Sequence, residues 1–324
     1  MKRRRVVSLL PSATEMVAAL GAIDALVGRS HECDFPPGVE ALPACTRALI
    51  DASAPSAGIQ AEMEKLLESG SSLYGIEAEL VKELAPTHIV TQVQCEVCAV
   101  SLADVEAALV GWAGPRPQVV TLGAVTLQGV LEDLRRLADA LEIRQKGDRL
   151  AGDLSRRWRD VAERASRAAV RPSVAAIEWL APLMAAGNWM PEMVELAGGR
   201  NLFGQPGSHS DWLAWDDLRR ADPDVVVLLP CGFPLERVQR EAGVLAVLPG
   251  WNELSAVAHD RVYLTEANQL FNRPGPRLAE SLEALAQMLH PGLFGRTLEG
   301  IAWRRLAANA SAPEVPPQRA HYLA

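Results

Sequence analysis

Thiol and imidazole side chains follow the predicted strands of this sequence. Five of them lie just past the carboxyl end of a strand: His31, Cys33, Cys95, Cys98 and Cys231. Parallel α/β sheets bind ligands at that end of their strands. Cysteine sulfur and neutral imidazole are donors for zinc, soft metal ions and iron–sulfur clusters. The sequence therefore predicts that these residues contact a metal or a metal-containing ligand, with the alternative that the cysteines are ordinary buried residues.

Tryptophan is the second chemical signal. The chain has eight Trp against five Phe and three Tyr. Flat indole rings suit the wall of a cleft that holds a large conjugated ring system. Trp189 and Trp212 lie in predicted loops and are the candidates for such a wall. Trp158 and Trp303 fit apolar helical stripes and are assigned to the core.

No catalytic motif accompanies these residues. The sequence contains neither a nucleophile elbow, nor HExxH, nor a glycine-rich phosphate loop. Glu15 follows Ser12 by three residues, which is the spacing of a capping box at the start of a helix. We therefore predict a structural role for Ser12 and Glu15 and a non-catalytic function for the chain as a whole.

Composition and charge favour a globular protein whose main partner is not nucleic acid. The chain of 324 residues is 49% hydrophobic and 22% charged, and 32 basic against 40 acidic residues give a net charge of −8. Nucleic-acid binding needs a concentrated basic face, which this balance does not favour. At this length, two lobes of ordinary size are expected.

The N-terminus matches a secretion signal only in part. Lys2–Arg5 are basic and an apolar run follows, but Pro11 and Glu15 interrupt it at about half of the usual ~7 to 15 residues. No run approaches the ~18 apolar residues of a membrane span. We therefore expect a cytoplasmic protein with reduced thiols, or a periplasmic one if the true start lies upstream.

Short apolar runs alternate with amphipathic segments along the chain. Strands are predicted at 6–10, 25–27, 87–91, 118–122, 173–179, 224–229 and 261–265. Helices are predicted at 15–20, 77–84, 102–110, 127–141, 192–196, 276–289 and 298–306, and one amphipathic piece at 59–67 leaves 36–75 otherwise undefined. This alternation predicts an α/β fold with parallel sheets covered on both faces.

A long helix is predicted between the two halves. Within 142–168, apolar residues recur every three or four positions, at Leu150, Leu154, Trp158, Val161 and Ala165. Such a helix is long enough to cross two small lobes. We predict an N-terminal α/β lobe over 1–141, a backbone helix over 142–168, a C-terminal α/β lobe over 169–291 and a partly disordered extension over 292–324.

The two halves share a local pattern. When Pro86 is placed on Pro223, an acid precedes each proline by seven residues, Glu79 in one half and Asp216 in the other. A cysteine follows each strand, nine residues after Pro86 and eight after Pro223. The match predicts two related lobes whose strand ends face each other across a ligand cleft.

Three segments resemble a known family: Val6–Glu15, Gly187–Phe203 and Asn272–Arg277. They are similar to the vitamin B12-binding protein of ABC importers and its iron-siderophore and haem-binding relatives, a class III periplasmic-binding-protein family, over about residues 6–291. The resemblance implies two Rossmann-like lobes joined by one long backbone helix, with a corrinoid or other metal chelate in the cleft. It also implies an ABC importer permease as partner, whose arginines contact acids at the positions of Glu79 and Asp216.

From the residues and the resemblance we expect reversible, non-catalytic binding of a cobalamin-like corrinoid, as a carrier or as an importer component. The thiols resemble a signal-less, cytoplasmic branch of the family rather than the typical importer pattern. The expected ligand-binding residues are Ser12, His31, Cys33, Gln92, Cys95, Cys98, Trp189, His209, Trp212, Cys231, Phe271 and Asn272. Two alternatives stay open: a Cys/His metalloprotein that holds zinc or an iron–sulfur cluster, with redox activity, and a scaffold whose cleft has lost its ligand.

Overall fold

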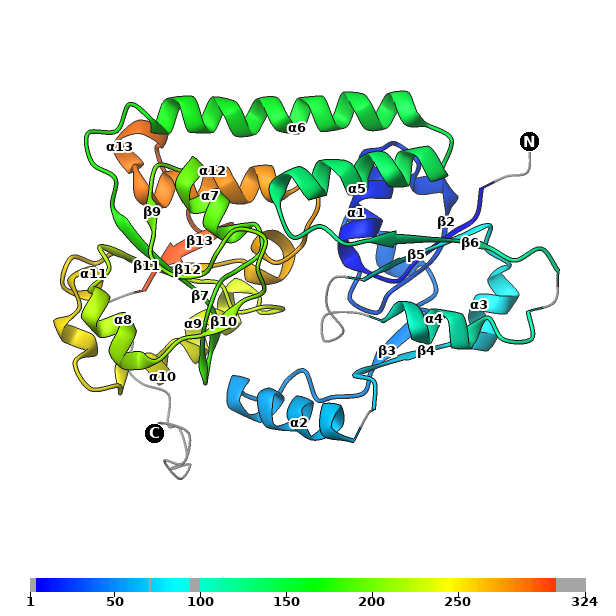
Figure 1. Ribbon diagram of the computed structural model, residues 1–324, viewed down its shortest axis with the longest axis horizontal. Coiled ribbons are helices and arrows are strands. Elements are labelled where there is room, and N and C mark those ends of the chain that lie inside the picture. Colours follow the sequence, from blue (N-terminus) through cyan, green and yellow to red (C-terminus); the bar gives the residue numbers. More distant parts are fainter. Residues whose placement is uncertain (1–3, 70, 94–99, 113, 307–324) are drawn as a thin grey trace. The chain divides into compact units, whose positions relative to one another are not determined.

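The predicted alternation of strands and helices is present in the computed structural model, which describes residues 4–69, 71–93, 100–112 and 114–306 (Figure 1). Two units make up the chain. Unit 1 comprises Met1–Ala54, Gly58–Leu154 and Pro274–Pro276, and unit 2 comprises Pro55–Ala57, Ser155–Arg273 and Arg277–Ala324. Each unit has its own sheet and covering helices, which confirms the predicted α/β class with two lobes.

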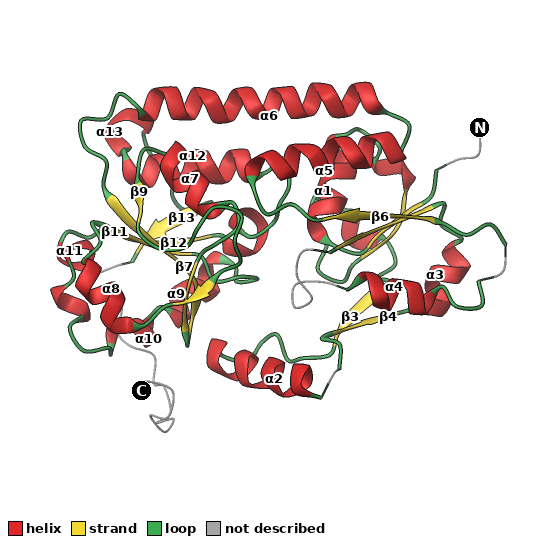
Figure 2. Cartoon of the chain, in the orientation of Figure 1, coloured by secondary structure: helices red, strands yellow, loops and turns green. Residues whose placement is uncertain are grey.

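A four-stranded parallel sheet forms the centre of unit 1. Its order is β2-β1-β5-β6, with β2 at Leu26–Arg29, β1 at Val6–Ser8, β5 at His88–Gln92 and β6 at Gln118–Leu122. Helices α1 (Pro11–Ala19) and α5 (Leu127–Ala140) cover one face, and α3 (Ala78–Leu84) and α4 (Leu102–Ala108) the other (Figure 2). The carboxyl ends of the strands lead into loops, where parallel sheets place their sites.

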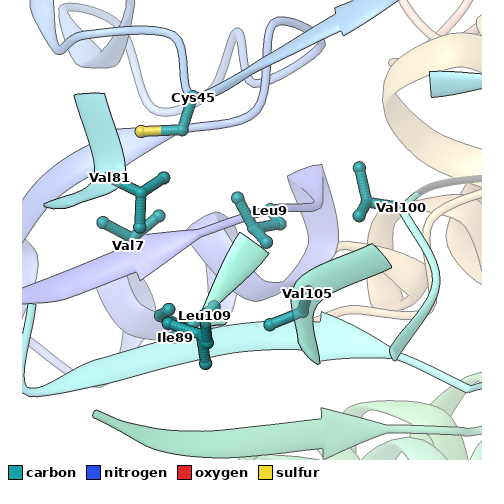
Figure 3. Packing of buried hydrophobic residues seen from close by; sticks show 8 residues of the cluster. All are labelled: Val7, Leu9, Cys45, Val81, Ile89, Val100, Val105 and Leu109. Carbon is teal, nitrogen blue, oxygen red and sulfur yellow. The ribbon is translucent and has the colours of Figure 1, made fainter. Parts of the chain in front are cut away.

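Apolar side chains on one face of this sheet pack against α3 and α4 (Figure 3). The cluster consists of Val7, Leu9, Cys45, Val81, Ile89, Val100, Val105 and Leu109. Gly28 in β2 leaves no room for a side chain, because a Cβ there would lie 2.6 Å from the Cys45 sulfur. Burial raises the pKa of the Cys45 thiol to about 11, so this cysteine packs as a neutral, apolar residue.

The segment 36–75, which the sequence left undefined, contains a small sheet and a helix. Strand β3 (Thr46–Ala48) pairs in antiparallel fashion with β4 (Tyr74–Ile76), and α2 (Ser56–Glu68) connects them in the chain. Short 3-10 helices precede β2 at Ile23–Ala25 (η1) and β3 at Val39–Ala41 (η2). This sheet brings β3 and β4 to the loop that follows β2, since the His31 and Tyr74 rings lie 5.8 Å apart.

The predicted capping box of Ser12 and Glu15 is wrong. Leu10 holds the N-cap position without a side-chain hydrogen bond, and Pro11 is the first helical residue of α1. Proline suits this position because its fixed φ matches the helix and its missing N–H would have no helical partner. Ser12 and Glu15 therefore lie inside the helix, where both are buried.

Helix α6 spans Arg144–Ala165 and confirms the predicted long helix. Its residues up to Leu154 belong to unit 1 and those from Ser155 to unit 2. The predicted apolar stripe is the buried face, with Leu154, Trp158, Val161 and Ala165 almost fully covered. Charged residues occupy the other faces, and some of them add polar contacts, such as Arg157 with Glu280 and Glu283.

The sheet of unit 2 has a parallel centre and antiparallel edges. The parallel strands are β9 (Arg200–Asn201), β7 (Ser173–Leu180), β11 (Val225–Leu228) and β12 (Val262–Thr265). The antiparallel strands are β8 (Leu183–Ala185), β10 (Asp211–Trp212) and β13 (Trp303–Arg305). The helices and helical turns are α7 (Met190–Leu196), α8 (Trp215–Ala221), α9 (Leu235–Glu241), α10 (Gly243–Ala246), η3 (Trp251–Glu253), α11 (Ser255–Ala258), η4 (Ala267–Phe271), α12 (Leu278–Leu289) and α13 (Pro291–Phe294).

The helix predicted at 298–306 is wrong, because this segment contains strand β13. Trp303 packs edge-on against Tyr263 of β12 with ring centroids 5.4 Å apart, and the backbone hydrogen bonds of β12 hold the segment extended. Trp303 is buried, so its assignment to the core is correct even though its helix is not. The disorder predicted for the end of the C-terminal extension falls on 307–324, outside the described residues.

The two halves repeat one arrangement of elements. In unit 1 the order is β2-β1-β5-β6, and the corresponding strands of unit 2 follow the order β9-β7-β11-β12. Helices α3 and α8 have seven residues each, and each is followed by a C-cap residue with φ of 41°, Ala85 and Asp222. Each of these residues precedes the aligned proline and the next strand, so the sequence match reflects a structural repeat.

Hydrogen bonds at the strand starts follow the same repeat. The Arg5 N–H donates to Thr87 Oγ1 at 3.0 Å at the start of β1, and the Ser173 N–H donates to Asp224 Oδ2 at 2.7 Å at the start of β7. Thr87 and Asp224 both directly follow the aligned prolines. Hydrogen bonds from Ser173 hold the pKa of the Asp224 carboxyl below its usual value. Equivalent positions thus form a hydrogen bond between the starts of the two central strands of each unit, β1 and β5 in unit 1 and β7 and β11 in unit 2.

Candidate functional site

In unit 1 the loop after β2 carries the predicted donor His31. The Arg29 guanidinium fixes this loop, because it donates hydrogen bonds to the carbonyls of Ser30 at 2.9 Å and His31 at 3.2 Å. The same side chain donates to the carbonyls of Leu42 and Glu40. One cation therefore binds four backbone carbonyls and holds the loop in a single arrangement.

The His31 ring is half-exposed and has one strong hydrogen bond. Its Nδ1 lies 2.7 Å from Thr46 Oγ1, and its backbone N–H donates to the same hydroxyl at 3.0 Å. Burial, with a smaller contribution from the Arg29 charge, lowers the pKa of His31 below its usual value. The imidazole is therefore neutral at neutral pH, which is the form that binds metals.

Cys33, Ser12 and Gln92 are placed differently from His31. All three are buried. The Cys33 sulfur lies 3.0 Å from Thr14 Oγ1, and Thr14 in turn donates to Ser8 Oγ at 2.8 Å. In this structure Cys33 belongs to a hydrogen-bonded network beneath the end of β1, and contact between its thiol and a ligand stays a prediction.

The predicted pair Cys95 and Cys98 lies outside the described residues. Within the described ranges, no three His, Cys, Asp or Glu residues form a group that could hold a metal ion. Cys231, in unit 2, is half-buried, and its backbone N–H donates to the Glu178 carbonyl at 3.1 Å. A shared metal site of the five predicted donors therefore stays a prediction.

In unit 2 Trp189 is part of the core. Its side chain is 5% exposed, and its indole N–H donates to the Phe271 carbonyl at 2.9 Å. Phe271 is itself fully buried. Asn272 is half-buried, and its amide donates to the carbonyls of Leu229 and Ala267. These residues anchor η4 to the end of β11 and to the start of α7.

Trp212 and His209 are exposed. Trp212 lies in the short strand β10 at the edge of the sheet, with 55% of its surface exposed. His209 is in the loop just before it. Of the two tryptophans predicted as a wall, Trp212 is thus the one whose ring is available to a ligand.

A half-buried glutamate that sequence reasoning missed organises this loop. Glu178, near the end of β7, accepts a hydrogen bond from Ser210 Oγ at 2.7 Å, and the Gly187 N–H donates to the same hydroxyl at 3.0 Å. A Cβ on Gly187 would lie 2.6 Å from the Ser208 carbonyl oxygen, so only glycine permits this approach. Burial raises the pKa of Glu178, against the smaller opposing effect of the Ser210 and Gly187 hydrogen bonds.

A signal for Glu178 is present in the sequence. It is the single charged residue in the otherwise apolar strand SVAAIEWL. Its neighbour Trp179 packs on Phe233 with ring centroids 5.3 Å apart, and the Arg237 guanidinium lies 3.6 Å above the Phe233 ring. The carboxyl ends of β7 and β11 thus combine aromatic rings, a thiol and a carboxyl.

The predicted docking acids occupy equivalent positions in the two units. Glu79 is the second residue of α3 and Asp216 the second residue of α8, and their side chains are 84% and 77% exposed. Each forms an ion pair with a basic residue one turn later, Lys82 and Arg219. Asp216 also lines a surface pocket together with charged neighbours of both signs.

Comparison with known proteins identifies the family. The sequence model of the periplasmic binding proteins matches residues 6–268. The chain belongs to the periplasmic binding protein family. Members of this family bind solutes, which agrees with the coarse functional expectation from the sequence.

Two curated relatives cover most of the chain. The uncharacterized ABC transporter substrate-binding lipoprotein YvrC of Bacillus subtilis is 23% identical over 299 residues, which are 90% of this chain and 81% of the relative. The vitamin B12-binding protein of Vibrio cholerae is 24% identical over 299 residues, 88% of each chain. Both relatives are thus named as binding proteins, one of them for the substrate of an ABC transporter and the other for vitamin B12.

Solved structures of the family share the fold. A periplasmic heme-binding protein of Pseudomonas aeruginosa superposes with a TM-score of 0.69 at 22% identity, covering 94% of this chain and 98% of its own. The periplasmic vitamin B12-binding protein of Vibrio cholerae gives a TM-score of 0.63 at 20% identity, covering 88% and 96%. None of the helices in the described ranges is both long and apolar enough to cross a membrane.

Proposed function

We propose that this protein reversibly binds a cobalamin-like corrinoid, or a similar metal chelate, without catalysing a reaction. The observation that carries the proposal is the presence of accessible donor and aromatic groups beyond strand ends in a solute-binding fold. His31 follows β2 in unit 1, and Cys231 follows β11 in unit 2, where Trp212 exposes its ring. A nitrogen or sulfur donor suits a metal centre, and an indole suits the flat ring around it.

The relatives support the same ligand class. One is a vitamin B12-binding protein and another a heme-binding protein, and both of these ligands are flat macrocycles with a central metal. The proposal extends this chemistry to the present chain. The proposal has two cellular forms: a cytoplasmic carrier that retains or hands over the ligand, and a component of an importer. Fractionation of cells that express the native gene distinguishes these two forms by the compartment in which the protein is found.

The alternative metalloprotein depends on thiols that the described ranges do not contain. Cys95 and Cys98 are the pair that a zinc or iron–sulfur site would need. Metal analysis of the purified protein distinguishes the two functions. Colourless, metal-free protein that turns pink or red with added cobalamin favours the carrier, whereas brown or zinc-containing protein favours the direct metal site.

Calorimetric titration tests the proposed function. The purified protein is titrated with cyanocobalamin, aquacobalamin, haemin and a ferric siderophore, and we expect saturable binding of at least one metal chelate with quenching of tryptophan fluorescence. Trp212→Ala should weaken that binding by about 1–3 kcal/mol, because its exposed ring is available for stacking. Absence of binding for all four chelates would reject the function, and full affinity in Trp212→Ala would remove this ring from the site.

Charge reversal tests the importer form of the proposal. Glu79→Lys and Asp216→Lys should each lower the affinity for an ABC importer permease by about tenfold, because a like charge would face the permease arginines. Ligand affinity should not change, since both acids are exposed on helices α3 and α8. Binding to the permease in lipid nanodiscs is the measurement, and the neighbouring exposed acids Glu83 and Asp217 supply matched control reversals.

A further inference from the structure

The hydroxyl of Thr46 determines which nitrogen of His31 carries the proton. Thr46 Oγ1 accepts a hydrogen bond from the His31 backbone N–H and donates its own proton to Ser30 Oγ at 3.2 Å. It also lies 2.7 Å from Nδ1 of the His31 ring. With the single Thr46 proton directed to Ser30 Oγ, Nδ1 is the donor in this third contact. Nε2 is then the unprotonated nitrogen and has a free lone pair.

This lone pair is accessible and the ring is held in place. Nε2 has no hydrogen-bond partner among the described residues, and the His31 side chain is half-exposed. The Tyr74 ring packs against the imidazole, and Arg29 fixes the loop backbone on either side of it. A donor atom prepared in this way needs little rearrangement when a ligand arrives, which favours binding.

A metal inside a macrocycle needs few protein donors. The ring nitrogens fill the four equatorial positions, so one axial donor completes one face of the metal. A neutral histidine whose second ring nitrogen donates a hydrogen bond is the usual form of such a ligand, because that hydrogen bond fixes its tautomer and orientation. We propose that His31 Nε2 is an axial ligand of the metal in the bound chelate. The inference rests on the proposed function and adds to it the atom that holds the metal.

The binding step is a ligand exchange. A water molecule leaves the metal, and the lone pair of Nε2 takes its place. One metal–oxygen bond breaks and one metal–nitrogen bond forms. No proton and no electron is transferred, because the imidazole is already neutral and the metal keeps its oxidation state. Aquacobalamin has an exchangeable water of this kind, whereas the cyanide of cyanocobalamin closes the same position.

The two cobalamins therefore form a matched pair for the test. In absorption titrations of the full-length protein, we expect the visible bands of aquacobalamin to shift towards those of its imidazole complex and the bands of cyanocobalamin to stay unchanged. His31→Ala should abolish the shift and weaken aquacobalamin binding by about 10- to 100-fold. Its affinity for cyanocobalamin should fall much less than its affinity for aquacobalamin, and an unchanged circular dichroism spectrum shows that the variant is folded. Haemin, followed at its Soret band, extends the test to an iron macrocycle.

Two further variants separate ligation from a general structural effect. Thr46→Val keeps the shape of the side chain but removes the hydrogen-bond acceptor, and should weaken aquacobalamin binding by about tenfold. His259→Ala removes an exposed histidine in unit 2 and should bind like the wild type. Unshifted bands in the wild type with bound aquacobalamin and haemin, or a retained shift in His31→Ala, would overturn the inference and leave the proposed function intact. Failure of every chelate to bind would overturn both.

Discussion

Replacement of Trp189 by alanine is expected to lower the free energy of unfolding by about 3–5 kcal/mol. The ring is 5% exposed, so its removal leaves a cavity between the start of α7 and η4. It also leaves the Phe271 carbonyl without the indole N–H that donates to it at 2.9 Å. Denaturant unfolding of the two proteins at one pH measures the difference, and the slope of the transition shows whether the variant unfolds in the same cooperative unit.

Trp212→Ala is the matched control. Its ring is 55% exposed, and loss of an exposed side chain away from the core should change the free energy of unfolding by no more than about 0.5 kcal/mol. The sequence predicted the same role for both rings, as walls of a ligand site. A stable Trp189→Ala protein with weakened chelate binding would restore that role to Trp189, and equal losses of stability in both variants would contradict the core assignment.

Glu178→Gln is expected to change the pH dependence of stability. Burial raises the pKa of the Glu178 carboxyl in the folded protein. Its stabilising contribution is therefore complete below the unfolded pKa of about 4.3 and is lost as the pH rises to the folded pKa, by up to about 1.4 kcal/mol per pH unit. Glutamine does not titrate. The free energy of unfolding of the variant should thus rise relative to that of the wild type as the pH increases from 4 to 7. Denaturant unfolding at several pH values measures this difference.

Glu178→Ala separates the charge from the hydrogen bond. This variant leaves the Ser210 hydroxyl without its acceptor, and should lower the free energy of unfolding by about 1–3 kcal/mol at pH 5. In Glu178→Gln, by contrast, the amide oxygen can still accept the hydrogen bond. Because Ser210 and Gly187 fix the loop that leads to Trp212, the alanine variant should also bind the chelate more weakly than the glutamine variant. Parallel pH profiles for wild type and Glu178→Gln would show that the carboxyl keeps its ordinary pKa.

Periodic apolar patterns predicted the architecture well, because a helix or strand that buries one whole face has apolar residues at regular intervals in its sequence. The stripe of α6 from Leu154 to Ala165 is the buried face of that helix, and the strands at 87–91 and 118–122 lie within one residue of β5 and β6. Short elements had no such signal. Strands β8 and β10 have three and two residues, too few for a period to appear, and β13 is extended because it pairs with β12.

The candidate site could be predicted only in part, since its contacts join residues that are distant in sequence. His31 was found from its place after β2, but its partners Thr46 and Tyr74 come from the antiparallel strands β3 and β4, which no pattern indicated. Glu178 and Ser210 are 32 positions apart in the sequence, with β8, α7 and β9 between them. Residue type alone did not indicate burial: Trp189 and Cys33, predicted as ligand contacts, are both buried in the structure, and their contact with a ligand stays a prediction.

The repeated turn at Ala85 and Asp222 bears on how this chain arose. Both residues adopt φ of 41° although neither is glycine, and each joins a seven-residue helix to a central strand at the same offset in residue number. Side-chain identity has diverged around a backbone conformation that has not. Tandem copying of a half-length ancestral gene leaves this trace, and the paired acids at the start of α3 and α8 are then a single inherited surface present twice.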